Sequence, residues 1–228
     1  MPAAAPPLIP LWIKIPYTAF VAVLFPIYLK NYGPTNFLFF CDVALLGAVV
    51  AIWLESPLLL SAFLVGIFVP QMIWVVDFLG EVCGVHLTGM TGYMFKPPFF
   101  LRFLSFFHFW LPFLLLYLVW KVGYDRRGVI VWIGIMWVLL TVCYAWMPPC
   151  SPEKDPVTGE QLRDPNIPVN INYVHSITSD SEPQNWMHPD LYLACYMMIL
   201  VGIYLATHLL FAWLIPPPAR VEQEALRA

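Results

Sequence analysis

The stretch PLLLSAFLVGIFVPQMIWVVDFL, residues 57–79, contains a single ionisable side chain, Asp77, among 23 residues. A helix of about 20 apolar residues matches the hydrocarbon thickness of a bilayer. The stretch therefore predicts a transmembrane helix. Pro70 does not oppose this prediction, because neighbouring helices can satisfy the backbone groups that a proline leaves unbonded.

Five other stretches have the same apolar character, and together they predict an all-α protein, a transmembrane bundle of about six spans. The chain has a mean hydropathy of +0.74, and 11% of its residues are charged, against about a quarter in soluble domains. The remaining connections are too short for a separate soluble domain, so residues 1–228 are expected to form one transmembrane domain. The expected spans are residues 11–29, 36–54, 57–79, 99–120, 129–147 and 190–215.

Two connecting segments differ from the other, shorter loops. GEVCGVHLTGMTGYMFKPP, residues 80–98, is too rich in glycine to span, so a loop or a re-entrant interfacial segment is expected there. Residues 148–189 hold six carboxylates against two cations. This composition predicts one long, solvated, acidic loop.

The distribution of lysine and arginine predicts the orientation of the bundle, because cytoplasmic loops carry an excess of these residues. The densest basic cluster is the connector Tyr124-Asp125-Arg126-Arg127, which lies on the same side as both termini. We therefore expect both termini in the cytoplasm and the acidic loop 148–189 outside. No basic stripe of the kind that binds nucleic acid is present in the sequence.

Asp42, Asp77 and His108 are the ionisable residues within the spans that most favour a functional site, because charge in hydrocarbon is costly. At about 1.5 Å per residue, Asp42 and His108 lie roughly 9 and 13 Å below the outer surface. Asp77 lies near the outer end of its span, with Glu81 just beyond it. The three spans thus predict a polar pocket that opens outward. In the alternative interpretation, each acid bonds a Trp, Tyr or backbone group and only fixes helices together.

An imidazole beside carboxylates is a ligand set that suits zinc or another divalent metal. The candidate ligands are His108, Asp77 and Asp42, with His175 on the outer loop as a fourth. The cysteines suggest a separate feature outside the membrane. Cys83 and Cys150 alone lie outside the spans, so a disulfide between them is expected if the outer compartment is oxidising.

Several short motifs carry a resemblance to known proteins. The chain resembles a group of small bacterial multi-pass integral membrane proteins with no assigned activity. This resemblance covers most of the chain and implies a bacterial inner-membrane protein. The motifs are FCDVALL (40–46), LESP (54–57), PQMIWVVDFLG (70–80), HFWLP (108–112), GYDRRG (123–128) and EPQNWM (182–187).

A second comparison concerns zinc chemistry. Ser105, His108 and Asp77 are similar in kind to the residues with which ceramidase-like intramembrane hydrolases hold zinc. That family also has an HxxxH pair on its last span. The pair is missing here, where Thr207-His208 stands alone.

Three functional hypotheses follow. The first is a multi-pass protein whose outward-facing polar pocket binds, and as an extension processes, a lipid or other apolar small molecule. The second is an accessory subunit that packs against other membrane proteins, where the same polar groups act as contacts between helices. The third is a metal-dependent intramembrane hydrolase. The expected partners are membrane lipids or other membrane-protein subunits.

Overall fold

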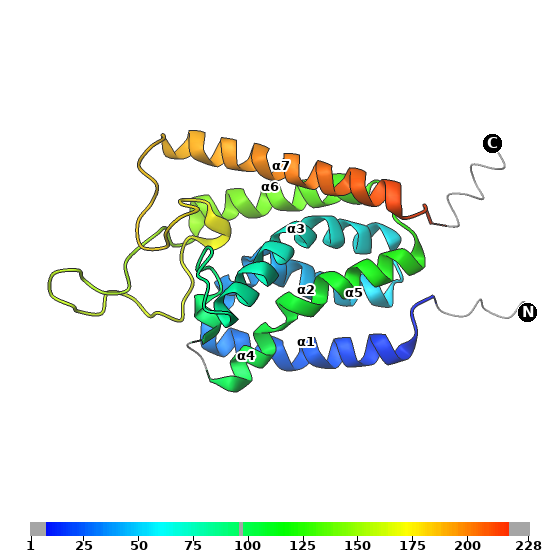
Figure 1. Cartoon of the computed structure of the whole chain (residues 1–228), viewed down its shortest axis with the longest axis horizontal. Helices are drawn as coiled ribbons and strands as arrows, with labels where there is room; N and C mark the ends of the chain where they lie inside the picture. Colours follow the sequence, from blue (N-terminus) through cyan, green and yellow to red (C-terminus); the bar gives the residue numbers. More distant parts are fainter. Residues whose placement is uncertain (1–7, 96–97, 219–228) are drawn as a thin grey trace, which may run out of the picture.

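The computed structural model describes residues 8–95 and 98–218, and in these ranges the protein is a helical bundle without β-strands. The helices run up and down a common axis, and consecutive helices are antiparallel except for α4 and α5, which follow one another in the same direction (Figure 1). Their bounds are α1 Leu11–Tyr32, α2 Phe40–Trp53, α3 Pro57–Val82, α4 Phe99–Ser105, α5 Phe107–Val122, α6 Gly128–Trp146 and α7 Pro189–Leu214. Short 3₁₀ turns cover Pro34–Leu38, Gly92–Phe95 and Ile171–Tyr173.

The expectation of an all-α transmembrane bundle is confirmed. Five helical segments are long and apolar enough to cross a membrane, namely α1, α3, the α4–α5 pair, α6 and α7. The second expected span, 36–54, is shorter than predicted, because α2 has only 14 residues and begins at Phe40. Gly33, with φ of +77°, ends α1, and Pro34 starts a 3₁₀ turn in the residues assigned to the start of that span.

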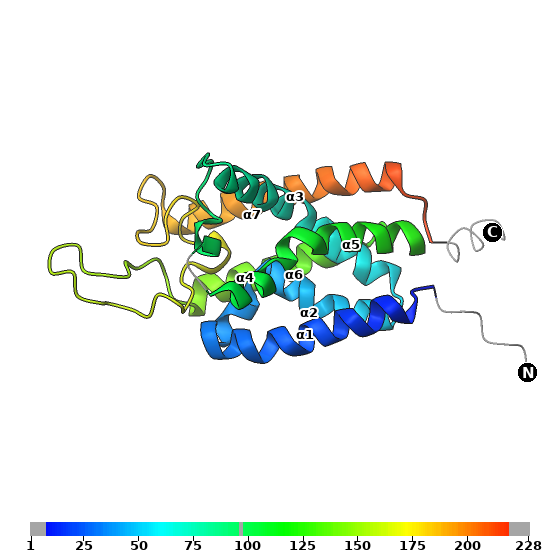
Figure 2. The same cartoon turned by 60° about the horizontal axis from the view of Figure 1, so that its bottom comes forward.

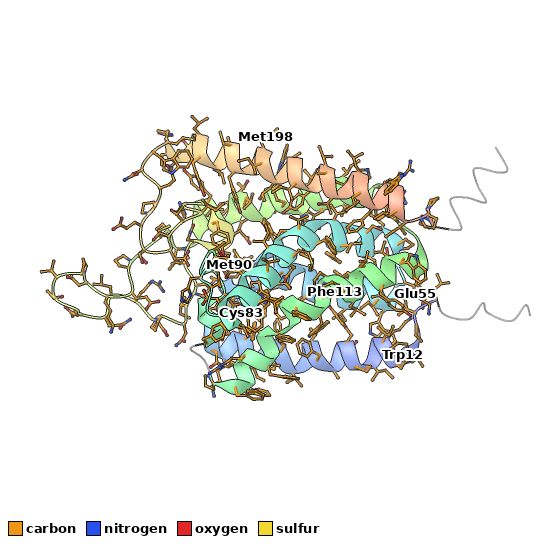
Figure 3. All side chains as sticks on the ribbon, in the orientation of Figure 1. Trp12, Glu55, Cys83, Met90, Phe113 and Met198 are labelled. Carbon is orange, nitrogen blue, oxygen red and sulfur yellow. The ribbon has the colours of Figure 1, made fainter. Side chains whose placement is uncertain are left out.

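The two ends of the bundle differ in what connects the helices. The start of α1 and the end of α7 lie at the same end, with the connections 54–56 and 123–127; we call this the connector end (Figures 1 and 2). The long segment 147–188 extends from the opposite end, together with 33–39 and 83–95; we call this the loop end. Figure 3 labels Glu55 at the connector end and Cys83 at the loop end.

Helix α3 is the centre of the bundle and the most buried of the long helices. It packs against α2, α5, α6 and α7. Its Gly66 is required by a close approach, because a Cβ there would lie 1.9 Å from the Trp132 ring of α6. Trp132 is itself fully buried and meets Phe63 and Tyr204 edge to face. The glycine therefore lets the largest core side chain fit against α3.

The predicted fourth span is broken at Phe106 into α4 and α5. His108 causes part of this break. The carbonyl of Ser105 accepts a bond from His108 Nδ1 at 2.8 Å, while the Phe109 amide turns to the Phe106 carbonyl instead. Pro112 also lacks the amide that would bond the carbonyl four residues earlier. The chain therefore enters the membrane at this point through a bent helix pair.

Candidate functional site

Asp77 is the residue around which the 83–95 loop is folded. One carboxylate oxygen accepts from the amides of Thr88 and Gly89 (2.7 and 3.2 Å) and from the Thr88 hydroxyl (2.7 Å). The other accepts from the amide and the hydroxyl of Thr91 at 2.9 and 2.6 Å. The side chain is thus fully occupied by its own loop. Its described contacts make it an anchor for that loop.

Asp42 has a different environment, in the first turn of α2. It is 3% exposed, and its Oδ2 accepts from Asn36 Nδ2 at 3.3 Å and from the Cys41 thiol at 3.8 Å. Its Oδ1 is buried and has no hydrogen-bond partner in the described residues. A carboxylate here gains from the positive end of the helix dipole. Asp42 is therefore the only one of the three sequence candidates with an unused buried carboxylate oxygen.

His108 lies between aromatic rings. Its imidazole stacks on Trp74 with centroids 5.1 Å apart and tilts against Phe107 at 4.1 Å. Its Nδ1 donates a hydrogen bond to the Ser105 carbonyl, because a carbonyl oxygen can only accept one. The Ser105 hydroxyl bonds Tyr28 at 2.6 Å instead of the histidine. The described residues therefore form no serine–histidine pair of the kind that nucleophilic catalysis uses.

The three predicted site residues share the loop end of the bundle, but each has its own partners and none bonds another. Trp74, stacked on His108, donates to the Tyr93 hydroxyl at 3.3 Å. Burial of this hydroxyl raises the pKa of Tyr93, although the residue as a whole is partly exposed. In the described residues the three candidates therefore do not form one ion-binding cluster.

Tyr173, from the long loop, also lies at the loop end. Burial raises its pKa to about 12, and the negative charges of Asp180 and Asp77 add to the shift. In the described residues no group of three or more His, Cys, Asp or Glu side chains is placed to hold a metal ion.

The two remaining candidate residues, Glu81 and His175, contact other parts of the chain. Glu81 pairs with His86 at 2.8 Å on the surface, and this carboxylate raises the pKa of His86. His175 stacks on Tyr144 with centroids 5.2 Å apart, and its buried Nε2 has no hydrogen-bond partner among the described residues. Burial lowers the pKa of His175, which favours the neutral ring. A neutral imidazole can bind a metal, but it has no described carboxylate or thiol group around it that completes a site.

The expected Cys83–Cys150 disulfide is not formed, and both cysteines are free. Cys83 is exposed at the end of α3, whereas Cys150 is buried and its thiol donates to the Ser179 carbonyl at 3.4 Å. The predicted link fails because one sulfur faces outward and the other faces the folded segment 148–182. Burial raises the pKa of Cys150 to about 11, so its thiol is also the less reactive of the two.

The largest departure from the sequence analysis is at residues 169–176, which were expected to be solvated. Ile171 and Val174 are buried in the main hydrophobic core. Asn172 is buried as well; its Oδ1 accepts from the Phe40 amide at 3.0 Å and its Nδ2 donates to the Leu38 carbonyl at 2.8 Å. The long loop thus inserts a plug into the loop end of the bundle. The alternation Val169-Asn170-Ile171-Asn172 was the sequence signal for it.

A shallow groove with two halves runs along the surface of the bundle. The half toward the connector end lies between α5 and the end of α7, the half toward the loop end lies along α3 beside the loop 83–95, and both halves are lined by Phe68. The half toward the connector end has a volume of about 510 Å³ and the half toward the loop end about 400 Å³. Figure 3 labels Phe113, which lies on α5 about midway between the two ends and lines the first half.

The two halves of the groove are lined almost entirely by apolar side chains. The loop-end half is bounded by Ile73, Val76 and Leu87 and ends at Asp77 and Thr88. From Phe68 to Asp77 the helix rises about 14 Å, so this half alone crosses much of one leaflet. The groove therefore joins the loop folded around Asp77 to the hydrocarbon layer.

A comparison of the chain with known protein families, with curated proteins and with solved structures finds no match.

Proposed function

We propose that this multi-pass membrane protein binds a lipid or another apolar small molecule in the groove along α3. The observation that carries the proposal is a pair of apolar hollows that share Phe68 in their linings. Each half has a volume within the range of about 300–1,000 Å³ that is usual for ligand sites. Because the groove opens toward the bilayer, a lipid chain reaches it without crossing water.

The polar groups around Asp77 at the loop end fit the same proposal. They mark the place where a polar part of the ligand would rest. The loop 83–95 is held against α3 by the Asp77 carboxylate, so the end of the groove is preformed. Its Thr88 is exposed to solvent. A ligand with an apolar body and a small polar end matches this arrangement better than a charged one does.

The proposal is for binding and does not include a chemical step. Ser105 is bonded to Tyr28, and His108 is bonded to a backbone carbonyl. In the described part of the chain, no set of side chains suits a catalytic metal. A zinc-dependent hydrolase therefore receives no support from the described residues.

We further propose that the loop end faces outward and the connector end faces the cytoplasm. In the described residues the loop end carries ten carboxylates against four cations, and the connector end two against four. The positive-inside rule counts lysine and arginine and gives carboxylates little weight, so its support for this orientation comes from the short connector, where Lys121, Arg126 and Arg127 lie close together in the chain. The loop-end carboxylates are Asp42, Asp77, Glu81, Glu153, Asp155, Glu160, Asp164, Asp180, Glu182 and Asp190, and the connector-end ones are Glu55 and Asp125.

Labelling of cysteine variants in intact cells tests the orientation. In a background with Cys83 replaced by serine, which removes the exposed native thiol of the loop end, Val157→Cys, at a position 91% exposed in the long loop, should react with a membrane-impermeant maleimide, whereas Arg126→Cys should not. The opposite pattern would reverse the orientation.

The binding proposal is tested by native mass spectrometry of the purified protein in mild detergent. The wild type should retain lipid. Ile73→Trp, which fills the loop-end half of the groove, should lower that retention at least several-fold. Leu205→Trp is the matched control, because Leu205 is similarly exposed on α7 and does not line the groove.

A wild type without bound lipid, or equal loss in both variants, would refute the proposal. Retention of a stoichiometric second protein in the place of lipid would instead support the accessory-subunit hypothesis.

A further inference from the structure

The connector end of the groove holds an unusual concentration of positive charge without matching carboxylates. Lys121 directly follows Trp120, which lines the groove on α5, and Arg126 lies in the connector that follows. Both are exposed. In the described part of the chain, no hydrogen bond or ion pair joins either one to a carboxylate.

The carboxylates at this end are already paired with other cations. Glu55 accepts from Lys14 at 2.7 Å, and Asp125 accepts from Arg127 at 2.8 and 3.1 Å. The Arg127 pair holds the pKa of Asp125 below its usual range, so this carboxylate stays ionised and engaged. The positive charge of Lys121 and Arg126 is therefore left over for a ligand.

The connector that carries Arg126 is held in place on both sides. The Tyr124 amide donates to the Pro216 carbonyl at 2.9 Å, and the Tyr124 hydroxyl bonds His208 Nδ1 at 2.8 Å. On the other side, the Asp125 amide donates to the Ser61 hydroxyl at 2.9 Å. A fixed connector keeps its cation near the groove without a large entropic cost of ordering.

The groove itself reaches this connector. The Tyr124 ring packs against Phe211, with centroids 6.2 Å apart, and Phe211 lines the groove. Tyr117 and Trp120 on α5 also line it and are partly exposed. Trp and Tyr prefer the headgroup level of a bilayer, which places the basic residues at the depth of lipid phosphates.

We infer that the connector-end half of the groove binds an anionic phospholipid. Its acyl chain lies between α5 and α7 along Phe113 and Phe211, and its phosphate lies between Lys121 and Arg126. Basic pockets between membrane helices on the cytoplasmic side are suited to such headgroups. The positive charge at the connector end favours a lipid with an anionic headgroup. The excess of carboxylates at the loop end would repel the same headgroup. The inference rests on the proposed function and names its lipid class.

The test uses the full chain in mixed micelles that contain equal amounts of phosphatidylglycerol and phosphatidylcholine with identical acyl chains. Native mass spectrometry then gives the ratio of the two bound lipids. The wild type should prefer phosphatidylglycerol. Lys121→Gln and Arg126→Gln should each lower the preference about fivefold, the effect of one basic residue near a charged membrane surface.

Two control variants separate this inference from the binding proposal. Lys30→Gln removes an exposed cation at the loop end and should leave the ratio unchanged. Leu210→Trp fills the connector-end half of the groove and should lower the retention of both lipids equally.

Three outcomes would overturn the inference. A wild type that binds both lipids equally, or a ratio that the double variant Lys121→Gln/Arg126→Gln leaves unchanged, refutes the anionic site while lipid binding stands. A wild type that retains neither lipid refutes the proposed function itself. Because both basic side chains are exposed, an unchanged melting temperature of the variants shows that the bundle is intact.

Discussion

Replacement of Asp77 by alanine should open the 83–95 loop without unfolding the bundle. The carboxylate accepts five hydrogen bonds, and truncation leaves all five donors without their partner. Thr88 and Gly89 are exposed and can bond water instead. Thr91 is fully buried, so its amide and hydroxyl account for most of the cost.

The size of the effect follows from those two buried bonds. A hydrogen bond to a charged group contributes about 1.5–3 kcal/mol, so the two together give about 3–6 kcal/mol of local stability. That corresponds to an increase of roughly 10²- to 10⁴-fold in the population of the open loop. Asp77→Asn keeps one oxygen for Thr88 and Gly89 but turns an amino group toward Thr91. Its effect should be intermediate, about 1–2 kcal/mol.

Hydrogen exchange followed by mass spectrometry measures this opening directly. Peptides covering residues 84–95 should exchange much faster in Asp77→Ala, and moderately faster in Asp77→Asn. Peptides from α6 serve as the internal control, because the hydrogen bonds of Asp77 go to the 83–95 loop and not to α6. If exchange of the 84–95 peptides in Asp77→Ala stays within threefold of the wild type, the carboxylate does not hold the loop and the reasoning fails.

Three further predictions address the core, the connector end and the cysteines. Gly66→Ala should lower the stability of the bundle by about 1–3 kcal/mol in thermal unfolding, because its Cβ collides with an indole ring; Gly134→Ala, where the space is open, should be neutral or stabilising. The pKa of Glu55 lies below its ordinary value, because the hydrogen bond from Lys14 and two backbone amides outweigh the opposing effect of burial. The contribution of Glu55 to stability is thus present above the ordinary glutamate pKa and lost as pH falls through the lowered value, and in Glu55→Gln this acid-dependent loss should disappear from the melting curve. Cys83 should react with maleimide in the folded protein without reductant. If it reacts only after reduction, the predicted Cys83–Cys150 disulfide is present after all.

The sequence was sufficient for the helices but not for their ends. Apolar length predicted each long helix, because the bilayer imposes that length on any helix that crosses it. The start of α2 was misplaced because the turn at Gly33 and Pro34 is a local backbone effect inside a continuous apolar run. The break at Phe106 was missed because it depends on the side chain of His108 bonding a backbone carbonyl.

The candidate site could be predicted in location but not in its contacts. Asp42, Asp77 and His108 lie toward the loop end of their helices, but α2 begins at Phe40, so Asp42 lies in its first turn and closer to the helix end than the depth estimate placed it. Their partners come from elements distant in the sequence or from irregular loops, and periodicity carries no information about those. The Thr88-Gly89 pair near Asp77 was a usable signal, because Gly89 has a φ of +74° and lets its loop fold back on the carboxylate.

The plug has a consequence for the order in which this protein is made. The amide at the start of α2 finds its acceptor in Asn172, which is 132 residues later in the chain. When α2 leaves the ribosome, more than half of the chain is still untranslated, and its first turn has no cap. The bundle therefore cannot reach its final form helix by helix as synthesis proceeds. The first turn of α2 is completed only in a late step at the loop end, when residues 169–176 arrive and cap a helix that was made long before.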